Sequence, residues 1–508
     1  MGGARPRDGG FDFQIARLRN RCNSRRKSLR NVQSNSRCND TLLSGTVNTE
    51  KDYPVKIPKW VYDRITEITD CVVGDTQWAV TRRQTLRWFL AHIWLETDDD
   101  GWTICTVRDI RSSYASLLGL CEISYQGQCY MSTLADFLPT LSDIEFRAGK
   151  ASKDPEKRRA SAWRFNPQQP VSVLGKLNLV DTDTGESINF RDLLKGNGKA
   201  PGHAIDVEKR QNELKQREKA FLAKVGRGRM SIQFVKELRS REPDHYYRAG
   251  IRSLNHLYNG RIEGQYVTYD HYYRLTFGGR YYDQAFQNLP NELKAKFRSG
   301  LLNYDIEACN LACLNHLFRE YGVDYCVDTS IYAEMMEHTG LTRKQCKQMV
   351  HTTTYRIGRV TIGINDGLGA KVYEWCGNRR KKALKLLRWW NQYVSPLRCA
   401  LESLLERVQT RHRENCSSPR NYHRYANEVG LILDLNSEDY QREKTHHQQY
   451  ARNKALLAFM ICGVEQAYIR EVVRMNPGRV CMLDHDGVVA TGALSLPDWR
   501  GFIMKVKD

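Results

Sequence analysis

The sequence lacks the cysteine patterns of disulfide frameworks and zinc ribbons. Its 508 residues include 15 cysteines, an odd number, and no Cys-x-x-Cys pair. Such usage argues against both kinds of site and favours reduced thiols in a cytoplasm. Cys309 and Cys313 lie four residues apart, as neighbours on a helix face do. This spacing favours small core residues over metal ligands.

Long apolar runs are absent as well. The longest, around Leu456 to Val464, is far too short to span a bilayer. The N-terminus shows no signal-peptide pattern. These absences predict a chain without a membrane partner, located in a cytoplasm.

Acidic residues are few relative to basic ones. The chain has 58 Asp and Glu against 78 Lys and Arg, which gives a formal net charge of +20. Such an excess attracts polyanions and suits a protein that neutralises many phosphates. A basic protein without a nucleic-acid role has the same balance, so charge alone leaves both possibilities open. A hydrophobic content of 41% is ordinary for globular proteins, and the length allows two or three domains.

Composition divides the chain into four segments. The first is rich in Arg, Ser and Asn and poor in large apolar residues, which predicts disorder. The third contains a linker and a highly charged helix over Val207–Val225, predicted to be a solvated spacer. The predicted organisation is a disordered basic tail over 1–50, a small domain over 55–195, a linker with the charged helix over 196–245, and an aromatic-rich domain over 246–508.

The domain over 55–195 has a helix-and-hairpin pattern. Helices are predicted over Thr81–Trp94, Thr106–Leu118 and Met131–Leu138, and strands over Asp143–Arg147 and Ala160–Phe165. The loop between the two strands carries Lys157, Arg158 and Arg159. Helices followed by a hairpin with a basic tip resemble a winged helix, whose wing would lie on a nucleic-acid backbone. An α+β domain with a merely exposed basic loop fits equally well.

Two aspartates in the C-terminal half follow apolar, strand-like runs. Asp305 ends the run Leu301–Asp305, and Asp486 lies at the turn of a predicted hairpin, Val480–Val489. Two carboxylates on rigid adjacent strands are what a pair of Mg²⁺ ions requires for nucleotidyl transfer. A turn or helix cap is the alternative for either residue alone.

A helix predicted over Leu341–Arg359 carries cations and aromatics on one face. Arg343, Lys347, His351 and Tyr355 follow one another at intervals of four residues. The two cations suit triphosphate oxygens and the charge on a departing pyrophosphate. Tyr355 can stack near a templating base and an incoming sugar. In isolation, a basic solvent-facing helix explains the same pattern.

Together these segments resemble the superfamily that joins family A DNA polymerases and phage-type single-subunit RNA polymerases. The resemblance covers about residues 246–508 and rests on five segments in the family's order: Gly278–Arg280 with Phe286–Pro290, Tyr304–Ala312, Arg343 with Lys347 and Tyr355, Ile461–Ala467, and His485–Asp486. It implies an α+β fold with a right-hand arrangement of palm, fingers and thumb. It also implies two Mg²⁺ ions, or Mn²⁺, held by Asp305 and Asp486, with a nucleic-acid template, a primer and nucleoside triphosphates as partners.

The same resemblance assigns further residues. Arg280, Asn310, His351 and Tyr355 fall at nucleotide-binding positions, and Gln287, Asn288 and His485 fall at positions that contact template or primer. Lys157, Arg158 and Arg159 would add nucleic-acid contacts from the N-terminal domain. Accessory replication proteins remain unspecified.

The sequence leaves the sugar of the product open. The Gln287–Pro290 segment and the short gaps between motifs favour a DNA-directed DNA polymerase of a phage, plasmid or mobile element, in a bacterial or phage-infected cell. Three departures favour ribonucleotides or leave the choice open: Asn310 replaces the family's sugar-selecting glutamate, His351 replaces an aromatic, and Gly487 replaces an acidic residue. Glu307 or Asp484 would be substitutes for that missing carboxylate. The alternatives are a phage-type RNA polymerase or primer-making polymerase, and a non-enzymatic replication initiator.

Overall fold

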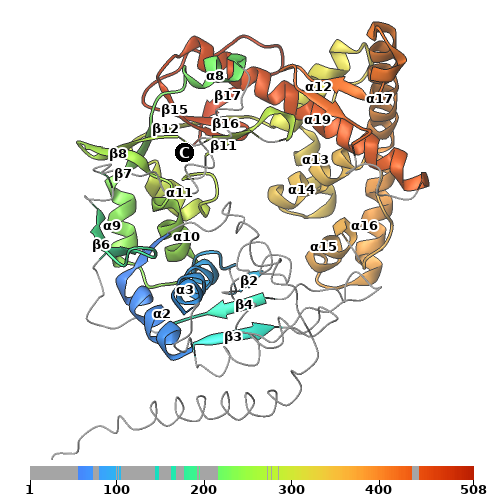
Figure 1. Ribbon diagram of the computed structural model, residues 1–508. Coiled ribbons are helices and arrows are strands. Elements are labelled where there is room, and N and C mark those ends of the chain that lie inside the picture. Colours follow the sequence, from blue (N-terminus) through green and yellow to red (C-terminus); the bar gives the residue numbers. More distant parts are fainter. Residues whose placement is uncertain are drawn as a thin grey trace, which may run out of the picture. The chain divides into compact units, whose positions relative to one another are not determined.

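The computed structural model describes most of the C-terminal half and parts of the N-terminal half (Figure 1). The described residues are 55–72, 79–98, 100, 102–104, 143–147, 162–167, 177–190, 194, 216–271, 273–275, 277–283, 285–365, 367–437 and 445–507. They form two compact units, and both mix helices with sheets, so the α+β class is confirmed. The first unit takes the described residues of Met1–Lys150, Arg159–Asn189 and Pro243–Arg248, and the second takes the rest.

The first unit packs two helices with two three-stranded sheets. Its elements are β1 (Lys56–Pro58), α2 (Lys59–Val72), α3 (Ala79–Leu95), β2 (Thr103–Ile104), β3 (Ile144–Arg147), β4 (Ala162–Phe165), β5 (Asn178–Asp181) and β6 (Ser187–Asn189). The strand orders are β1-β5-β6 and β2-β4-β3. Trp163 on β4 is fully buried and meets Phe89 of α3 edge-on, with ring centroids 5.5 Å apart. Large aromatics therefore join a helix to the second sheet.

Several predicted elements of this unit are confirmed. Helix α3 covers the predicted Thr81–Trp94, and β3 pairs antiparallel with β4, Ile144 opposite Phe165. The predicted helices Thr106–Leu118 and Met131–Leu138 lie outside the described residues, as does the basic loop with Lys157, Arg158 and Arg159. The winged helix therefore stays a prediction.

The second unit alternates strands and helices, has a run of helices from α12 to α17, and ends in three strands. Its first elements are α8 (Gln216–Leu222), β7 (Gly228–Ser231), α9 (Ile232–Ser240), α10 (His245–Leu254, whose first four residues belong to the other unit), β8 (Tyr258–Glu263), β9 (Tyr266–Asp270), β10 (Tyr273–Leu275), η6 (Phe277–Gly279), β11 (Tyr281–Asp283), α11 (Asn291–Phe297) and β12 (Leu302–Ile306). The later ones are α12 (Cys309–Glu320), α13 (Ile331–Thr339), α14 (Arg343–Tyr355), α15 (Gly367–Trp375), α16 (Arg380–Tyr393), α17 (Ser395–Asn415), η7 (Pro419–Asn421), β13 (Arg424–Ala426), β14 (Ile432–Asp434), α19 (Thr445–Met475), β15 (Val480–Asp484), β16 (Gly487–Ala490) and β17 (Met504–Val506). Within the described ranges, no helix has the length and apolar character needed to cross a membrane.

A four-stranded sheet forms the centre of the second unit. Its strand order is β15-β16-β12-β17, and all neighbouring strands are antiparallel. Residues of β15 and β16 are buried except for Asp484, and α12 packs along α19 within the same hydrophobic core. The sheet thus combines strands separated by almost two hundred residues, and such long-range pairing is fixed by tertiary packing.

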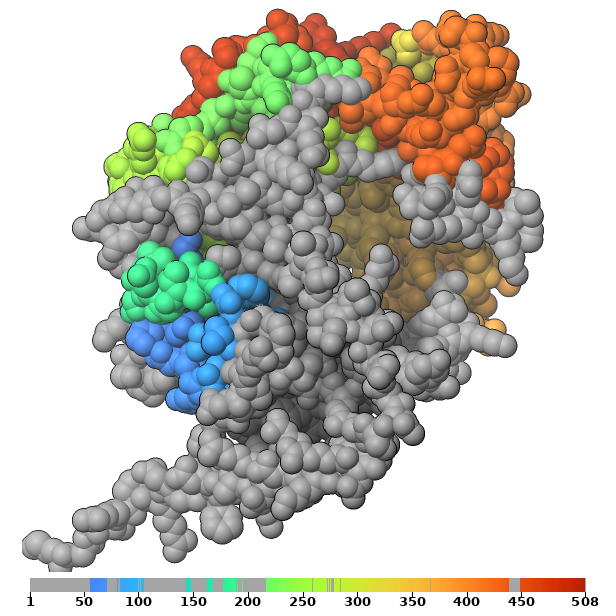
Figure 2. Space-filling view, viewed as in Figure 1, coloured from blue at the N-terminus to red at the C-terminus, as the bar shows by residue number. Residues whose placement is uncertain are grey.

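Helix α8 corrects one prediction. The charged segment Val207–Val225 was expected to be a solvated spacer, but Phe221 lies in the hydrophobic core and Glu218 is buried. Glu218 forms an ion pair with Arg470 of α19 at 2.6 Å and accepts a hydrogen bond from the Tyr281 hydroxyl. Helix α8, green in Figure 2, accordingly lies against the red C-terminal segments. A buried carboxylate needs such partners, so this part of the segment is a fixed element of the fold.

Candidate active site

Asp305 lies on β12, and Asp486 lies in the turn between β15 and β16, the strand that pairs with β12. Asp305 is at the end of β12, opposite Gly487, and the Ile306 amide donates to the Asp486 carbonyl oxygen at 3.1 Å. A Cβ atom at Gly487 would lie 2.4 Å from the Tyr304 carbonyl oxygen. Only glycine therefore allows the strands this approach, which accounts for the missing acidic residue at this position.

Both carboxylates face a cavity of about 390 Å³. Basic residues also line this cavity, namely Lys294, Arg298 and Lys507. Burial raises the pKa of Asp486 to about 6, with further contributions from the charges of Asp305 and Glu465, while Lys347 acts in the opposite direction. A carboxylate whose ionisation is opposed by neighbouring carboxylates is a favourable place for a cation.

Lys505 on β17 and Lys507 directly after this strand are two lysines that the sequence did not single out. Lys507 Nζ lies 2.8 Å from Asp305 Oδ2, and Lys505 Nζ lies 2.7 Å from Glu307 Oε2. Strand β17 pairs directly with β12, which places these lysines beside the two acidic residues. Lys507 supplies positive charge at the edge of the cavity.

The carboxylate pair fits magnesium in its chemistry. Asp305 on β12 and Asp486 in the β15–β16 turn provide oxygen ligands, the donor type that Mg²⁺ prefers. Glu307 and Asp484, the suggested substitutes for a third carboxylate, form ion pairs with Lys505 and Lys294, as Asp305 does with Lys507, and Asp484 also lines the cavity. No group of three or more metal-ligating side chains occurs among the residues that the structure describes. The candidate ligands are the two aspartates that the family resemblance assigned, which leaves further positions for phosphate oxygens and water.

Helix α14 begins at Arg343 because Thr342 and Gln345 form a capping box. The Thr342 hydroxyl accepts from the Gln345 amide, and the Gln345 side chain accepts from the Thr342 amide. Arg343, Lys347 and His351 are exposed on this helix. Partial desolvation and the charges of Arg280 and Lys347 lower the pKa of His351. Arg280, far away in sequence, therefore lies near this face of the helix.

Tyr355 and Asn310 are in direct contact. The Tyr355 hydroxyl donates to Asn310 Oδ1 at 3.0 Å, which joins the end of α14 to the start of α12. The ring of His351 lies 4.6 Å from that of Tyr355. The structure thus brings together three of the four residues that the sequence assigned to nucleotide binding.

Arg280, the fourth, forms a bidentate ion pair with Glu465 of α19. Its Nε and a terminal nitrogen lie 2.7 and 2.5 Å from the two carboxylate oxygens. The preceding Gly278 has φ 75°, and a Cβ there would lie 2.2 Å from Cys462 Cβ. This close approach of the turn to α19 brings Arg280 to Glu465. The sequence placed Glu465 in a family-like helix but assigned it no role.

Gln287 is buried and bonds to protein backbone. Its side-chain nitrogen donates to the Tyr281 carbonyl oxygen at 2.9 Å and to the Leu483 carbonyl oxygen at 2.6 Å. Strand β15 is at the edge of its sheet, so its outward carbonyls need partners from elsewhere. The structure therefore gives Gln287 a place beneath the hairpin of Asp486 and not at the surface.

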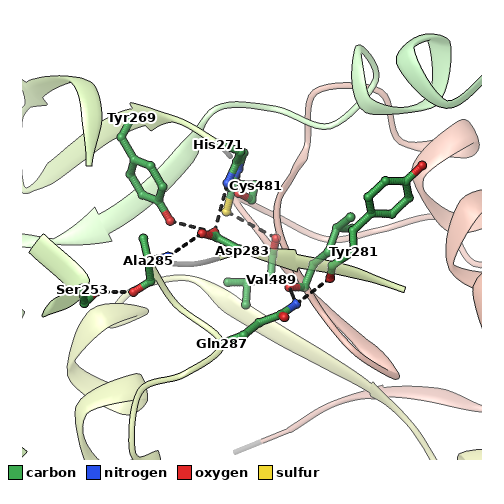
Figure 3. A network of polar contacts seen from close by, with 10 residues as sticks. Ser253, Tyr269, His271, Tyr281, Asp283, Ala285, Gln287, Cys481 and Val489 are labelled. Atoms are coloured by element: carbon green, nitrogen blue, oxygen red, sulfur yellow. Dashed lines mark hydrogen bonds and ion pairs between the residues drawn. The ribbon is translucent and has the colours of Figure 1, made fainter. Parts of the chain in front are cut away.

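His271 is a second side chain that donates a hydrogen bond to a carbonyl oxygen of β15. His271 Nε2 donates to the Cys481 carbonyl oxygen at 2.6 Å, and His271 Nδ1 lies 3.0 Å from Asp283 Oδ2. Figure 3 shows Asp283 between His271 and Tyr269, whose hydroxyl donates to the same carboxylate at 3.0 Å. Asp283 is itself held by the Ala285 amide. This network fixes the strand that leads to Asp486.

The other residues predicted to contact nucleic acid differ in exposure. Asn288 is exposed in the turn before α11. His485 has a left-handed backbone, φ 53°, and its ring meets that of Tyr282 edge-on at 4.8 Å. Burial lowers the pKa of His485, which favours a neutral ring at neutral pH. Lys157, Arg158 and Arg159 lie outside the described residues.

Comparison of the sequence with protein families and with curated proteins gives no match. Among solved structures, the chain is similar to the polymerase domain of Pol1 from M. smegmatis, in a complex with DNA primer-template and dNTP. That likeness has a TM-score of 0.33 and 14% sequence identity, and it covers 52% of this chain and 47% of that chain. The chain thus spans less than half of that polymerase domain's length, and at this TM-score the likeness has no bearing on the activity.

We expect Gln287→Leu to slow the reaction proposed below by about tenfold or more. The change leaves two backbone carbonyls without their donor and releases the strand that positions Asp486. Asn476→Leu is the matched control, because its buried amide also donates to two carbonyls, those of Val472 and Ser495. Steady-state primer extension and thermal unfolding measure both variants. If Gln287→Leu and Asn476→Leu lose equal stability and also lose equal kcat, Gln287 has no positioning role.

Proposed function

We propose that this chain is a template-directed nucleic-acid polymerase that acts by two-metal nucleotidyl transfer. The observation that supports it is that Asp305 on β12 lies beside Asp486 in the β15–β16 turn, with the charges of Glu465 and Lys347 acting on Asp486. The function that best fits these residues is a DNA-directed DNA polymerase of a phage, plasmid or mobile element. The central sheet serves as the palm and helices α13 to α16 serve as the fingers.

Each candidate residue has a role in this proposal. Asp305 and Asp486 would hold two Mg²⁺ ions, or Mn²⁺, which when bound supply activation of a primer 3′-hydroxyl and charge neutralisation on the triphosphate. Arg343 and Lys347 bind phosphate oxygens and offset the charge on the leaving pyrophosphate. His351, with Tyr355, presents rings to the incoming nucleotide. In the same proposal Arg280 lies at the nucleotide site, Asn288 and His485 contact primer or template, and the domain predicted over 55–195 binds nucleic acid through Lys157, Arg158 and Arg159.

The decisive experiment is primer extension on a defined template. The full chain is incubated with a labelled primer-template, Mg²⁺ or Mn²⁺, and either dNTPs or NTPs. Template-dependent addition of the complementary nucleotide supports the proposal. Binding of the primer-template without extension under any of these conditions contradicts it and favours the replication initiator.

Synthesis from ribonucleotides is the second candidate, and the Tyr355–Asn310 contact favours it. An enzyme rejects ribose by placing a bulky side chain against the 2′-carbon, and Asn310 is one methylene shorter than the family's glutamate. Its Oδ1 accepts from Tyr355, so its amide nitrogen is available to a ribose 2′-hydroxyl. A phage-type RNA polymerase or a primer-making polymerase would use this feature.

We therefore expect weak discrimination between dATP and ATP. The ratio of their kcat/KM values opposite thymine should stay below about 10⁴, which corresponds to about 5 kcal/mol. Asn310→Glu should move this ratio toward dATP by tenfold or more, because the longer carboxylate reaches the 2′-carbon while still accepting from Tyr355. Single-nucleotide incorporation kinetics measure the ratio.

The matched control is Asn415→Glu, the same substitution at an exposed residue at the end of α17. It should leave the ratio unchanged. Tyr355→Phe, which removes the hydroxyl that holds Asn310, should lower discrimination further. A ratio that does not respond to Asn310→Glu would show that another residue faces the sugar.

A further inference from the structure

The outward face of α16 carries a dense group of positive charges. The sequence has no acidic residue between Glu374 and Glu402. Six cations lie on or beside α16 and all are exposed: Arg379, Arg380, Lys381, Lys382, Lys385 and Arg388. In the described part of the chain, none of the six side chains has a hydrogen bond or ion pair with another residue. We call this set the α16 cation face.

The positions of these charges oppose the preferences of an isolated helix. Arg379 is the N-cap and makes no side-chain cap, and Arg380, Lys381 and Lys382 occupy the first turn. The positive end of the helix dipole disfavours cations there and favours anions. Their mutual repulsion adds to this cost. Cations in the first turn of a helix, with no acidic side chain of the same chain to pair with them, indicate that an anion from outside the chain binds there.

The opposite face of α16 is fixed to the proposed nucleotide-binding helix. Ala383, Leu386, Leu387 and Trp390 are buried, and Trp390 Nε1 donates to Thr353 Oγ1 of α14 at 2.8 Å. Figure 1 shows α16 next to α15 and α17 in the same helical region. The cation face is therefore held on a rigid element that contacts α14.

An aromatic surface adjoins the last of the cations. Trp389 follows Arg388, is partly exposed and stacks on His338 with ring centroids 4.1 Å apart. Tyr393, one turn further on, lies 5.1 Å from the Trp389 ring. Cations that follow a phosphate backbone, together with aromatic rings for unpaired bases, are the features of single-strand binding sites. Base pairs in a duplex are stacked internally and cannot use such rings.

We propose that the α16 cation face binds the single-stranded template before it is copied. Lys381, Lys385 and Arg388 lie at intervals of four and three residues, so they form one stripe with steps of about 6 and about 4.5 Å along the helix axis. Phosphates of the strand bind this stripe, and unpaired bases stack on Trp389. That the bound strand is a template rests on the proposed function, whereas binding of a single strand at this face does not.

The test uses the full chain with Lys381→Gln, Lys385→Gln and Arg388→Gln combined. Fluorescence anisotropy of a labelled oligothymidylate is measured in EDTA over a range of salt concentrations. Loss of three phosphate contacts should weaken binding at least tenfold at moderate salt and reduce the slope of log K against log salt by about 2. Trp389→Ala should weaken binding by about tenfold with the slope unchanged.

The matched control removes three exposed charges elsewhere, with Lys219→Gln, Lys236→Gln and Arg239→Gln. Its net charge equals that of the α16 variant, so an equal loss of affinity in both overturns the proposal. The proposal is also overturned if the α16 substitutions weaken binding of oligothymidylate less than binding of blunt duplex. It is overturned as well if the wild type binds anionic phospholipid vesicles in preference to oligothymidylate. This binding test measures no synthesis, so it is independent of the proposed function. If the wild type shows no primer extension but binds oligothymidylate, and the α16 variant loses that binding, only the proposed function is refuted.

Discussion

Asp305→Asn and Asp486→Asn should each lower primer extension by at least about a thousandfold. Each replaces a carboxylate that would hold the metal ions with a neutral amide, and this removes about 4 kcal/mol or more of transition-state stabilisation. Binding of primer-template should stay within about twofold, because phosphate contacts elsewhere hold the nucleic acid. Single-turnover extension and mobility shift measure the two properties.

The matched control for these variants is Asp484→Asn. Asp484 lies on the same hairpin, but it forms an ion pair with Lys294 at 3.3 Å and is not assigned to the metal ions. It should keep activity within about tenfold of the wild type. Retention of more than a tenth of the rate by Asp305→Asn or Asp486→Asn would contradict the metal assignment.

Asp486→Asn should raise the stability of the fold although it lowers activity. The folded-state pKa of Asp486, about 6, lies above its ordinary value of 3.8, so ionisation begins to destabilise the fold above the ordinary value and has its full effect above pH 6. Removing the carboxylate should raise the thermal midpoint in EDTA at pH 8. The difference should decrease as the pH falls from 6 and disappear below the ordinary pKa of 3.8, where both states bind the proton. A variant that unfolds earlier at pH 8 would show that Asp486 stabilises the fold by contacts other than its charge.

The sequence predicted the elements whose signals are local. The apolar run before Asp305, the hairpin of Asp486 and the four-residue spacing from Arg343 to Tyr355 each correspond to the expected strand, turn or helix. Periodicity and turn chemistry determine such elements over short windows. These elements contain both aspartates and the cations that the proposed chemistry uses.

Contacts between distant segments could not be predicted in this way. Lys507 reaches Asp305 only because β17 pairs with β12, and Glu465 pairs with Arg280 only because a glycine turn packs on α19. Gln287 has the same local appearance whether it faces nucleic acid or the backbone of β15. Its orientation follows from the position of β15 at the sheet edge, a property of strand order and not of nearby residues.

Glu465→Leu should lower the free energy of unfolding by about 3–5 kcal/mol. Glu465 is 1% exposed and accepts two short hydrogen bonds from Arg280, so its removal takes away the carboxylate partner of a largely buried guanidinium. Arg280→Met should cost a similar amount, because it leaves the Glu465 carboxylate without that guanidinium. Urea unfolding measures both variants. The matched control is Glu471→Ala, which breaks the exposed pair with Arg474 on the same helix and should leave stability unchanged.

The double variant Arg280→Met with Glu465→Leu separates stability from function. Apolar side chains of similar volume remove both charges, so stability should return to within about 1 kcal/mol of the wild type. Synthesis should remain lost, because the proposal places Arg280 at the nucleotide and its charge acts on His351 and Tyr355. A double variant that regains both stability and synthesis would show that the pair only supports the fold. If it regains stability but not synthesis, the buried pair is kept for the arginine that it holds beside α14.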